Sequence, residues 1–508
     1  MRTSIRAALL CAGLVSMPAL AAPAVLWEKV WSYDHAAGNA AGQKAEIPAY
    51  DPLNDTLWVA GVAGVDVLNA RTGTLIHHID LSALGDVNSV AIRNGVAAVA
   101  IAAPDHTQPG TVQLFNSNTF AAAERIQVGA LPDMVTFTPD GSRLLVANEG
   151  ERAVMTDPTS TDPVGSVSVI DMSSRTVVAT PGFSGVAGSD SVRLFPGKTA
   201  AVDLEPEYIA VSPDGSKAYV SLQEANAVGI LDLVTNTFTE VKNLGTKDYS
   251  LPGQGIDPSD KDGSTAVRNV PVKGMYMPDT IATYVAGGQT YLVTANEGDT
   301  RDEDVRIKNV TLDPSVFPDA DELQKDENLG RLNISPFDGL NANGEHEALY
   351  SYGTRSFSIR DANGELVFDS GDDFERLLGE RFPDIYDDGR SDNKGPEPEG
   401  LALMDVGGRM LAFIGFERTL ERLATAVIAI YDITDPLHSR FLDFIVSPGD
   451  LAPEGLVAFS RDGGNFLAVS SEGSDTTSLF RINMVPEPGG VALVLTALGL
   501  LGVVRRKR

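Results

Sequence analysis

The sequence predicts an all-β fold, a β-propeller that we expect to have seven blades and long loop insertions. Short β-branched segments alternate with turns rich in Gly, Pro, Asp and Asn, so the hydrophobic period is two rather than that of a helix. A hairpin pattern recurs along the chain, and a third strand follows each hairpin. Small antiparallel sheets repeated without intervening helices are typical of a propeller, with a β-sandwich or a two-domain sandwich as the alternative.

The repeated hairpin is clearest in residues 137–146, 211–220 and 459–468, which align with one another and each carry an Asp-Gly pair. Asp-Gly readily adopts the turn that joins two antiparallel strands. We expect a third strand in each of seven units. These strands are residues 65–69, 112–116, 167–171, 228–232, 329–333, 428–432 and 478–482.

Several stretches break the repeat and are interpreted as insertions. A short one covers residues 153–163, and longer ones cover residues 245–273, 301–328 and 337–396. Connections of this length are usually lids, binding elements or disordered segments.

The two ends of the chain have the composition of targeting signals. Arg2 and Arg6 precede an apolar run, and Ala19-Leu20-Ala21 supplies the small residues of a cleavage site, so residues 1–21 are predicted to be a secretory signal peptide. The propeller domain is then expected over residues 22–484. Beyond it, Val485-Pro486-Glu487-Pro488 precedes the apolar segment 489–504 and four basic residues. That segment is short for a permanent transmembrane helix.

This C-terminal arrangement, residues 485–508, resembles the PEP-CTERM sorting signal of Gram-negative bacteria. The resemblance implies export across the inner membrane, transient anchoring by the apolar segment, and cleavage by an exosortase near the Pro-Glu-Pro sequence. The expected partners during export are therefore exosortase and the secretion machinery. The expected destination is the cell envelope, the cell surface or the extracellular matrix, and a simple C-terminal membrane anchor is the alternative.

The composition excludes some partners and favours others. With 39 Lys and Arg against 69 Asp and Glu, the formal net charge is −30, so the chain lacks the basic surface that nucleic acid requires. The acidic balance favours cations or cationic surfaces. Cys11 is the only cysteine, and the six histidines form no zinc-hydrolase pattern. Disulfide, thiolate and zinc chemistry are therefore not expected.

A pair of acidic residues recurs in five hairpins. The first strand begins with Pro and an acid, and the second ends in another acid sixteen to eighteen residues later. These two positions lie side by side at the end of a hairpin away from its turn, and in a propeller such ends converge on the axis. The expected ring of carboxylates, predicted as metal ligands, is Asp133, Glu149, Glu207, Glu224, Asp279, Glu297, Glu399, Glu417, Glu454 and Glu472. The ring is lopsided, because Val62 and an alanine occupy the second position in the first two units.

Like charges opposite one another destabilise a sheet, so these pairs require compensation. One source is arginine, and the candidates are Arg152, Arg301, Arg355 and Arg418. The other is bound Ca²⁺ or another divalent cation, which prefers carboxylate and carbonyl oxygens. Three roles stay open for the ring: fasteners between sheets, a cation site, or a catalytic site. Residues 257–263 form a second candidate cation loop, although the Glu of an EF-hand loop is absent.

Four segments resemble the choice-of-anchor I family of bacterial surface proteins, which is related to the mesenchyme-specific cell-surface glycoprotein group. They are residues 295–301, 352–359, 391–400 and 413–418. The resemblance implies a propeller presented at the cell surface. Relatives often carry an alkaline-phosphatase-like label, which implies a phosphoesterase as an alternative activity. The chain departs from the family after Arg418, where Thr419-Leu420 stands in place of Gly-Gly.

Together these patterns favour an exported, surface-sorted protein that binds divalent cations and, through them, extracellular polysaccharide or mineral. One alternative is a secreted calcium-dependent phosphoesterase, in which metals activate water and the candidate arginines bind phosphate oxygens. The other is a purely structural surface scaffold. Glu297, Glu399 and Glu417 are the first candidates for metal ligands, and the sequence assigns no catalytic residue.

Overall fold

The computed structural model describes residues 24–38, 43–154, 157, 159–301 and 303–485. Its regular structure is almost entirely β, which confirms the predicted fold class, and Trp27–Ile482 forms one compact unit. Within the described residues, none of the helices combines the length and the apolar character needed to cross a bilayer. The predicted signal peptide and the predicted sorting segment beyond Val485 lie outside the described residues.

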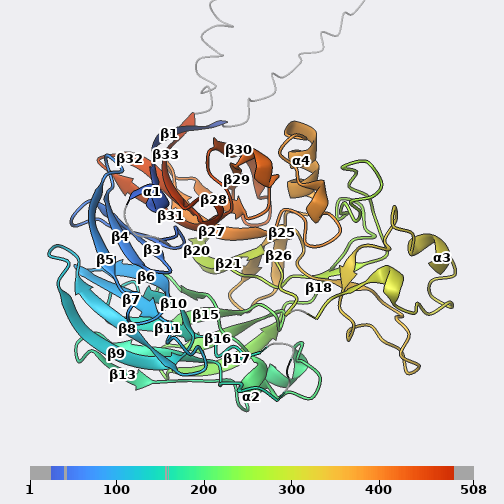
Figure 1. Cartoon of the computed structure of the whole chain (residues 1–508), viewed down its shortest axis with the longest axis horizontal. Coiled ribbons are helices and arrows are strands. Elements are labelled where there is room, and N and C mark those ends of the chain that lie inside the picture. Colours follow the sequence, from blue (N-terminus) through green and yellow to red (C-terminus); the bar gives the residue numbers. More distant parts are fainter. Residues whose placement is uncertain (1–23, 39–42, 155–156, 158, 302, 486–508) are drawn as a thin grey trace, which may run out of the picture. The chain divides into compact units, whose positions relative to one another are not determined.

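Seven four-stranded antiparallel sheets occur in the described part of the chain (Figure 1). The first three are β2–β5 (Pro48–Asp51, Thr56–Gly61, Gly64–Asn69, Leu75–Asp80), β6–β9 (Val87–Arg93, Val96–Ile101, Pro109–Asn116, Ala122–Ala130) and β10–β13 (Pro132–Phe137, Arg143–Asn148, Ser166–Asp171, Thr176–Ala179). The next three are β14–β17 (Ile209–Val211, Lys217–Leu222, Ala227–Asp232, Thr237–Asn243), β20–β21–β25–β26 (Ile281–Ala286, Gln289–Asn296, Ser356–Asp361, Leu366–Asp369) and β27–β30 (Pro398–Asp405, Met410–Phe416, Thr425–Asp432, Arg440–Pro448). The last has the order β1–β33–β32–β31 (Ala24–Asp34, Thr476–Val485, Gly464–Ser471, Pro453–Arg461).

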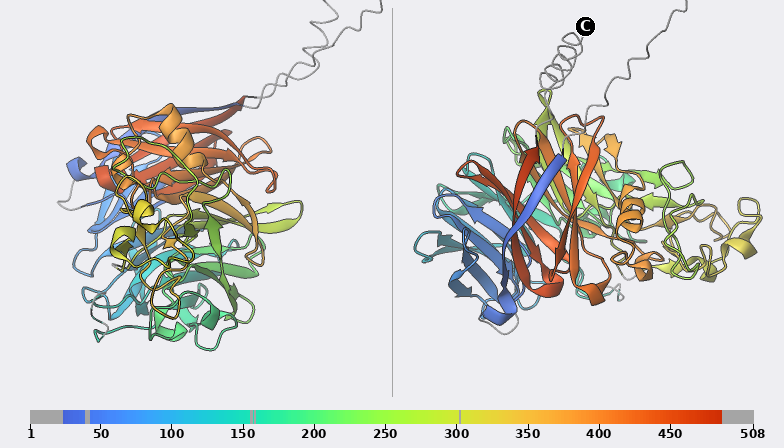
Figure 2. Two further views of the ribbon diagram at one scale, coloured as in Figure 1. Left: turned by 90° about the vertical axis from the view of Figure 1, so that its right-hand side faces the viewer. Right: turned by 90° about the horizontal axis from the view of Figure 1, so that it is seen from above.

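The sheets are joined in a closed ring. The first strand of each sheet packs against the first strand of the next, in the order β2, β6, β10, β14, β20, β27, β31 and back to β2. Strand β1 completes the sheet that β31, β32 and β33 begin, so the first and last of the described strands share one sheet. This arrangement is a β-propeller. Figure 2 shows neighbouring sheets lying face to face.

Burial explains the sequence pattern within each sheet. The second strands are buried on both faces, as in β3, where Leu57, Trp58, Val59 and Ala60 are all inaccessible, because each sheet is covered by its two neighbours. The outer strands alternate instead between exposed and covered positions, as in β13. Continuous apolar runs therefore mark the inner strands, and alternation marks the outer ones.

The three predicted Asp-Gly hairpins are confirmed as β10–β11, β14–β15 and β31–β32. In the third, Asp462 and Gly463 have φ angles of 51° and 73°, and both therefore lie in the left-handed region that a two-residue turn requires. In the first, the Asp140 carboxylate accepts a hydrogen bond from the backbone N–H of Ser142 at 3.0 Å.

Six of the seven predicted third strands lie in β4, β8, β12, β16, β29 and β33, and one prediction was wrong. Residues 329–333 do not form the third strand of their sheet, which is β25, paired with β21. Asn333–Ile334 is instead β23, which pairs with β22 (Val305–Arg306). The prediction failed because an insertion separates the second and third strands, and Leu329 and Leu332 belong to its own hydrophobic cluster.

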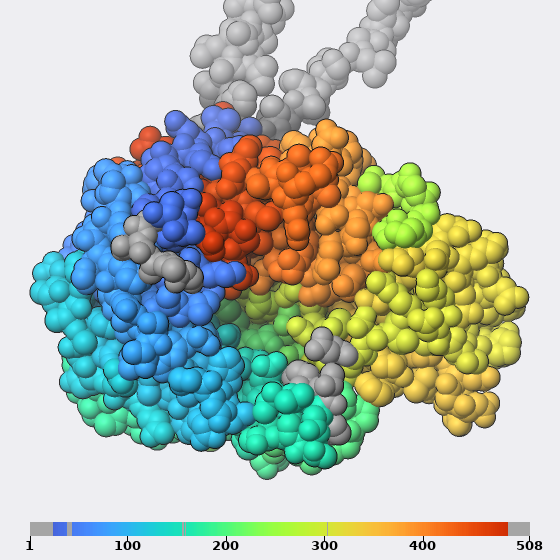
Figure 3. Space-filling view, in the orientation of Figure 1, coloured from blue at the N-terminus to red at the C-terminus, as the bar shows by residue number. Residues whose placement is uncertain are grey.

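The insertions build a region beside the ring, drawn in yellow and olive at the right of Figures 1 and 3. It contains the sheet β18–β19–β24 (Thr246–Asp248, Lys273–Met275, Tyr350–Ser351) and the helix α3 (Ala320–Leu323). Helix α4 (Asp373–Arg381), orange near the top of Figure 1, also belongs to an insertion, but its Phe374 and Leu378 join the hydrophobic cluster of two neighbouring sheets of the ring. Two further short helices, α1 (His35–Gly38) and α2 (Ala200–Asp203), lie in other connections. The remaining helical turns are 3-10 turns at Ser189–Ser191, Ile307–Asn309, Asp388–Arg390, Glu421–Leu423 and Glu472–Ser474.

Candidate functional site: a cavity lined by carboxylates

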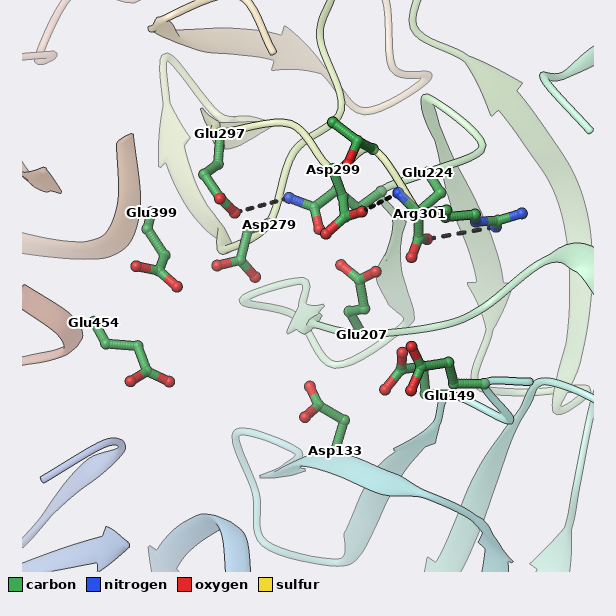
Figure 4. Close-up of a pocket in the computed structure, with 13 residues that line it drawn as sticks. Asp133, Glu149, Glu207, Glu224, Asp279, Glu297, Asp299, Arg301, Glu399 and Glu454 are labelled. Carbon is green, nitrogen blue, oxygen red and sulfur yellow. Dashed lines mark hydrogen bonds and ion pairs between the residues drawn. The ribbon is translucent and has the colours of Figure 1, made fainter. Parts of the chain in front are cut away.

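Acidic side chains from five sheets line a cavity of about 480 Å³ (Figure 4). Eight of the ten predicted ring residues are among them: Asp133, Glu149, Glu207, Glu224, Asp279, Glu297, Glu399 and Glu454. Glu417 and Glu472 do not line it. The lining includes no residue of the sheets β2–β5 and β6–β9, the two units in which the second acid of the repeat is missing.

The hairpin register places the two acids of a unit side by side. Pro132 pairs with Asn148, Pro398 with Phe416, and Pro453 with Ser471, so the acid that follows each of these residues lies at the same end of the hairpin. The positions expected from the sequence spacing are therefore the positions that the strands adopt.

A residue in the left-handed conformation precedes four of the five Pro-acid pairs. Leu131, Met277, Glu397 and Ala452 have φ angles of 46°, 46°, 51° and 54°. Residues before proline favour extended backbone, so each of these positions stores strain, on the order of 1–3 kcal/mol. The residue types differ, so no pattern in the sequence indicated this feature.

The strained residues also fix the second acid. The backbone N–H groups of Glu149, Glu417 and Glu472 donate to the carbonyls of Leu131, Glu397 and Ala452, each at 2.9 Å. One hydrogen bond therefore ties the start of the first strand to the end of the second, and the two carboxylates of the unit are held together.

Two groups of three carboxylates have dimensions that suit a metal ion. In the first, defined here as the inner group, oxygen atoms of Asp279, Glu297 and Glu399 lie within 4.8 Å of one another. In the second, the outer group, the same holds for Glu297, Glu397 and Glu417. Glu297 belongs to both. Carboxylate oxygens in this number and spacing are the donors that a hard divalent cation uses.

Burial and mutual repulsion raise the pKa values of the cavity acids. Desolvation is the largest cause for Glu207, Asp279, Glu399 and Glu454, whose pKa values lie well above the usual range, and neighbouring carboxylates add to it. The same causes, in the same order, raise the pKa of Asp133 to about 6.

Some cavity oxygens have no partner. Oε2 of Glu399 and Oε2 of Glu454 are buried and accept no hydrogen bond from any described residue. A buried carboxylate oxygen without a donor is costly, so these atoms are suited to a cation.

The four candidate arginines are all engaged with acids. Arg301 lines the cavity, but its guanidinium pairs with Asp203 at 3.1 Å and with Glu205 at 2.9 Å. The other three do not line the cavity. Arg418 pairs with Glu417 at 2.6 Å, Arg152 with Asp162 at 3.4 Å, and Arg355 with Glu375 in the inserted region at 2.6 Å.

Sequence reasoning missed several participants. Glu151 and Asp299 line the cavity, and each lies two residues beyond a ring acid in an Asn-Glu-Gly-acid sequence, a shared pattern that could have revealed them. Gln223 donates to Oε2 of Glu297 at 3.0 Å. Lys394 contacts Oε1 of the same residue at 2.5 Å, and no local pattern pointed to it.

The predicted cation loop at residues 257–263 is organised differently. Asp262 pairs with Arg268 at 2.5 Å, and Asp260 pairs with Arg331 and with Lys261. Basic side chains of the inserted region therefore already neutralise these acids, and the loop forms no carboxylate group comparable to the inner group among the described residues.

Comparisons with known proteins give the family. The model of the choice-of-anchor I domain matches residues 46–436. Gigasin-3a of Magallana gigas is 29% identical over 201 residues, 33% of this chain and 69% of that protein. The mesenchyme-specific cell surface glycoprotein of Strongylocentrotus purpuratus is 30% identical over 290 residues, 47% of this chain but only 37% of that protein. A hydrazine synthase structure from Kuenenia stuttgartiensis aligns with a TM-score of 0.49 and 15% identity, over 87% of this chain and 97% of the other. Since the family model spans most of the chain, the protein belongs to the choice-of-anchor I domain family, a family of surface-associated proteins.

Proposed function

We propose that this protein binds a divalent cation, with Ca²⁺ as the first candidate, in the carboxylate cavity. Through that cation it would hold an extracellular-matrix ligand such as an acidic polysaccharide or a mineral surface. The observation that carries the proposal is the inner group, Asp279, Glu297 and Glu399, whose oxygens lie within 4.8 Å of one another. Among the described residues, Arg301 is the only basic residue that lines the cavity.

The electrostatics of the cavity support a cation. Placing several carboxylates together away from water is unfavourable unless each charge is paired or protonated. The pKa values of Asp279 and Glu399 are raised, which favours the second response, protonation. A divalent cation supplies the first, and its binding would release those protons, so the affinity should increase with pH.

The phosphoesterase alternative receives less support from the geometry. A phosphate ester would need a basic side chain in the cavity to hold its oxygens. Arg301, the basic residue that lines the cavity, is already shared among Asp203, Glu205 and Glu224. No specific observation in the described residues favours turnover over binding.

The proposed export route would place the cavity outside the cell, where a low affinity for Ca²⁺ is sufficient. The signal peptide and the PEP-CTERM signal are proposed from sequence patterns at residues 1–21 and 485–508. They would deliver the cavity to the surface or the matrix of a Gram-negative bacterium. Extracellular calcium modules work with dissociation constants of about 10⁻⁴–10⁻³ M, so a site of three carboxylates would suffice there.

Thermal and urea unfolding of the full chain, in calcium chloride and in chelator, tests the proposal. At free Ca²⁺ about 100-fold above Kd, a site present only in the folded state should add about 2.7 kcal/mol to the free energy of unfolding. We expect Glu297→Gln and Glu399→Gln to lose this increase. Glu240→Gln, at an exposed position on β17, is the matched control and should keep it.

The outcomes separate the three functions. An unmodified chain that gains no stability from Ca²⁺ would contradict the proposal and favour the scaffold. A gain that survives in both cavity variants would place the cation elsewhere. Phosphate release from a generic ester, dependent on Ca²⁺ and lost in the same variants, would favour the phosphoesterase.

A further inference from the structure

A lysine occupies the outer group. Lys394 lies in the connection before β27, and its side chain is only 12% exposed. Its ammonium contacts Oε1 of Glu297 at 2.5 Å, Oε2 of Glu397 at 2.9 Å and the carbonyl of Gly298 at 2.7 Å. The ammonium donates hydrogen bonds to the Glu297 and Gly298 oxygens, and its contact with Glu397 is an ion pair.

The outer group is neutralised on its other side as well. Arg390 donates to Oε1 of Glu397 at 2.8 Å, and Arg418 pairs with Glu417 at 2.6 Å. Three basic side chains therefore face its three carboxylates. The two groups differ in charge balance, although they share Glu297 and in each of them the oxygens lie within 4.8 Å of one another.

We propose that Lys394 is a tethered cation that fills the outer group, so that the two adjoining groups take one divalent ion instead of two. This inference rests on the proposed function, because it concerns the capacity of the same cavity. Lys394 would then set both the number of ions and their position.

The position of Glu297 explains why the lysine decides the number. Its Oε1 faces Lys394, and its Oε2 accepts a hydrogen bond from Gln223, a residue that lines the cavity. With a divalent ion in each group, Glu297 would bridge the two ions. With an ammonium in the outer group, it instead bridges one ion and one lysine.

Removal of the Lys394 ammonium should favour binding of another cation in the outer group. Glu397 is 1% exposed, and its Oε2 accepts no hydrogen bond and has the Lys394 ammonium as its partner. Without the lysine this oxygen would be buried with no partner, although Arg390 would still hold Oε1, and the Glu297 carboxylate would lose the ammonium that pairs with it. Both changes are unfavourable. A second Ca²⁺ would restore the missing charge with a ligand set that already exists.

The test is the number of Ca²⁺ equivalents bound by the full chain, measured by equilibrium dialysis and by isothermal titration with calcium chloride near neutral pH. We expect Lys394→Met to bind one equivalent more than the unmodified chain. Lys44→Met is the matched control, because Lys44 pairs with the ring residue Glu472 at 2.9 Å, outside both groups. It should bind the same number as the unmodified chain.

A second variant guards against misfolding of the first. In Lys394→Met/Glu397→Gln one positive and one negative charge are removed together and the outer group has lost a carboxylate ligand, so this variant should fold in chelator and bind no additional equivalent. An unchanged or reduced number in Lys394→Met, with binding retained by the unmodified chain, would overturn this inference alone. Absence of binding by the unmodified chain would overturn the proposed function itself.

Discussion

The cavity and the inserted region both bury carboxylates, but they balance the charge differently. In the inserted region, Arg355 is 3% exposed and pairs with Glu375 at 2.6 Å, and its guanidinium also donates to the carbonyl oxygens of Asp257, Ser391 and Asn393. In the cavity, Glu399 and Glu454 each present a buried oxygen with no donor among the described residues. The counter-charge, and not burial alone, therefore distinguishes a structural ion pair from a candidate binding site.

The largest predicted effect concerns the buried ion pair of Arg355 and Glu375 in the inserted region. Replacement of Arg355 by Met should lower the free energy of unfolding by about 3–5 kcal/mol, because the buried Glu375 carboxylate would lose its partner. Urea unfolding in the presence of Ca²⁺ measures this change. Arg381→Met is the control, since Arg381 and its partner Asp443 are 43% and 42% exposed at 3.3 Å. If both variants have the same free energy of unfolding, the contacts of Arg355 do not stabilise the fold as their geometry indicates.

The second prediction concerns the response of the cavity to pH. Burial, together with nearby carboxylates, raises the pKa of Asp133 to about 6 and the pKa values of the inner-group acids Asp279 and Glu399 well above the usual range. The folded chain therefore holds more protons than the unfolded chain between about pH 4 and pH 7. In chelator, stability should fall as the pH rises from 5 to 7.5, by about 1.4 kcal/mol per pH unit for each extra proton held.

Calcium should remove this decline, because an ion in the cavity takes the place of the protons. Unfolding midpoints at several pH values, with and without Ca²⁺, provide the measurement. Asp140 and Asp171, whose hydrogen bonds lower their pKa values to about 2, titrate below this window and do not confound it. Stability that increases with pH in chelator would contradict the repulsion inferred for the cavity.

The smallest predicted effect concerns an exposed ion pair outside the cavity. Lys44 and Glu472 pair at 2.9 Å, but their side chains are 40% and 41% exposed. Because exposed ion pairs contribute little, Lys44→Met should change the free energy of unfolding by less than about 1 kcal/mol and leave the Ca²⁺ response intact. A larger loss of unfolding free energy, measured by urea unfolding, would mean that this ion pair stabilises the fold as a buried pair does.

The cavity itself was partly predictable. The spacing of Pro-acid and strand-end acid identified eight residues that line it, because strand register follows from the local alternation and from the turn. The grouping of Asp279, Glu297 and Glu399 was not predictable at this level, since it depends on how two neighbouring sheets approach each other. Arg355 shows the same limit: its sequence neighbourhood suggested a ring arginine, but the inserted region supplies Glu375 as its partner.

The sequence by itself determined the class of fold, the hairpins and the acidic pairs. Each of these depends on residues close together in the chain, such as Asp462-Gly463 at a turn or Pro398-Glu399 at a strand start. Tertiary structure decided the closure of β1 against β33, the late third strand β25, and the position of Lys394 between Glu297 and Glu397. These features join residues far apart in the chain, and their geometry depends on how packed sheets and insertions meet, which local periodicity does not encode.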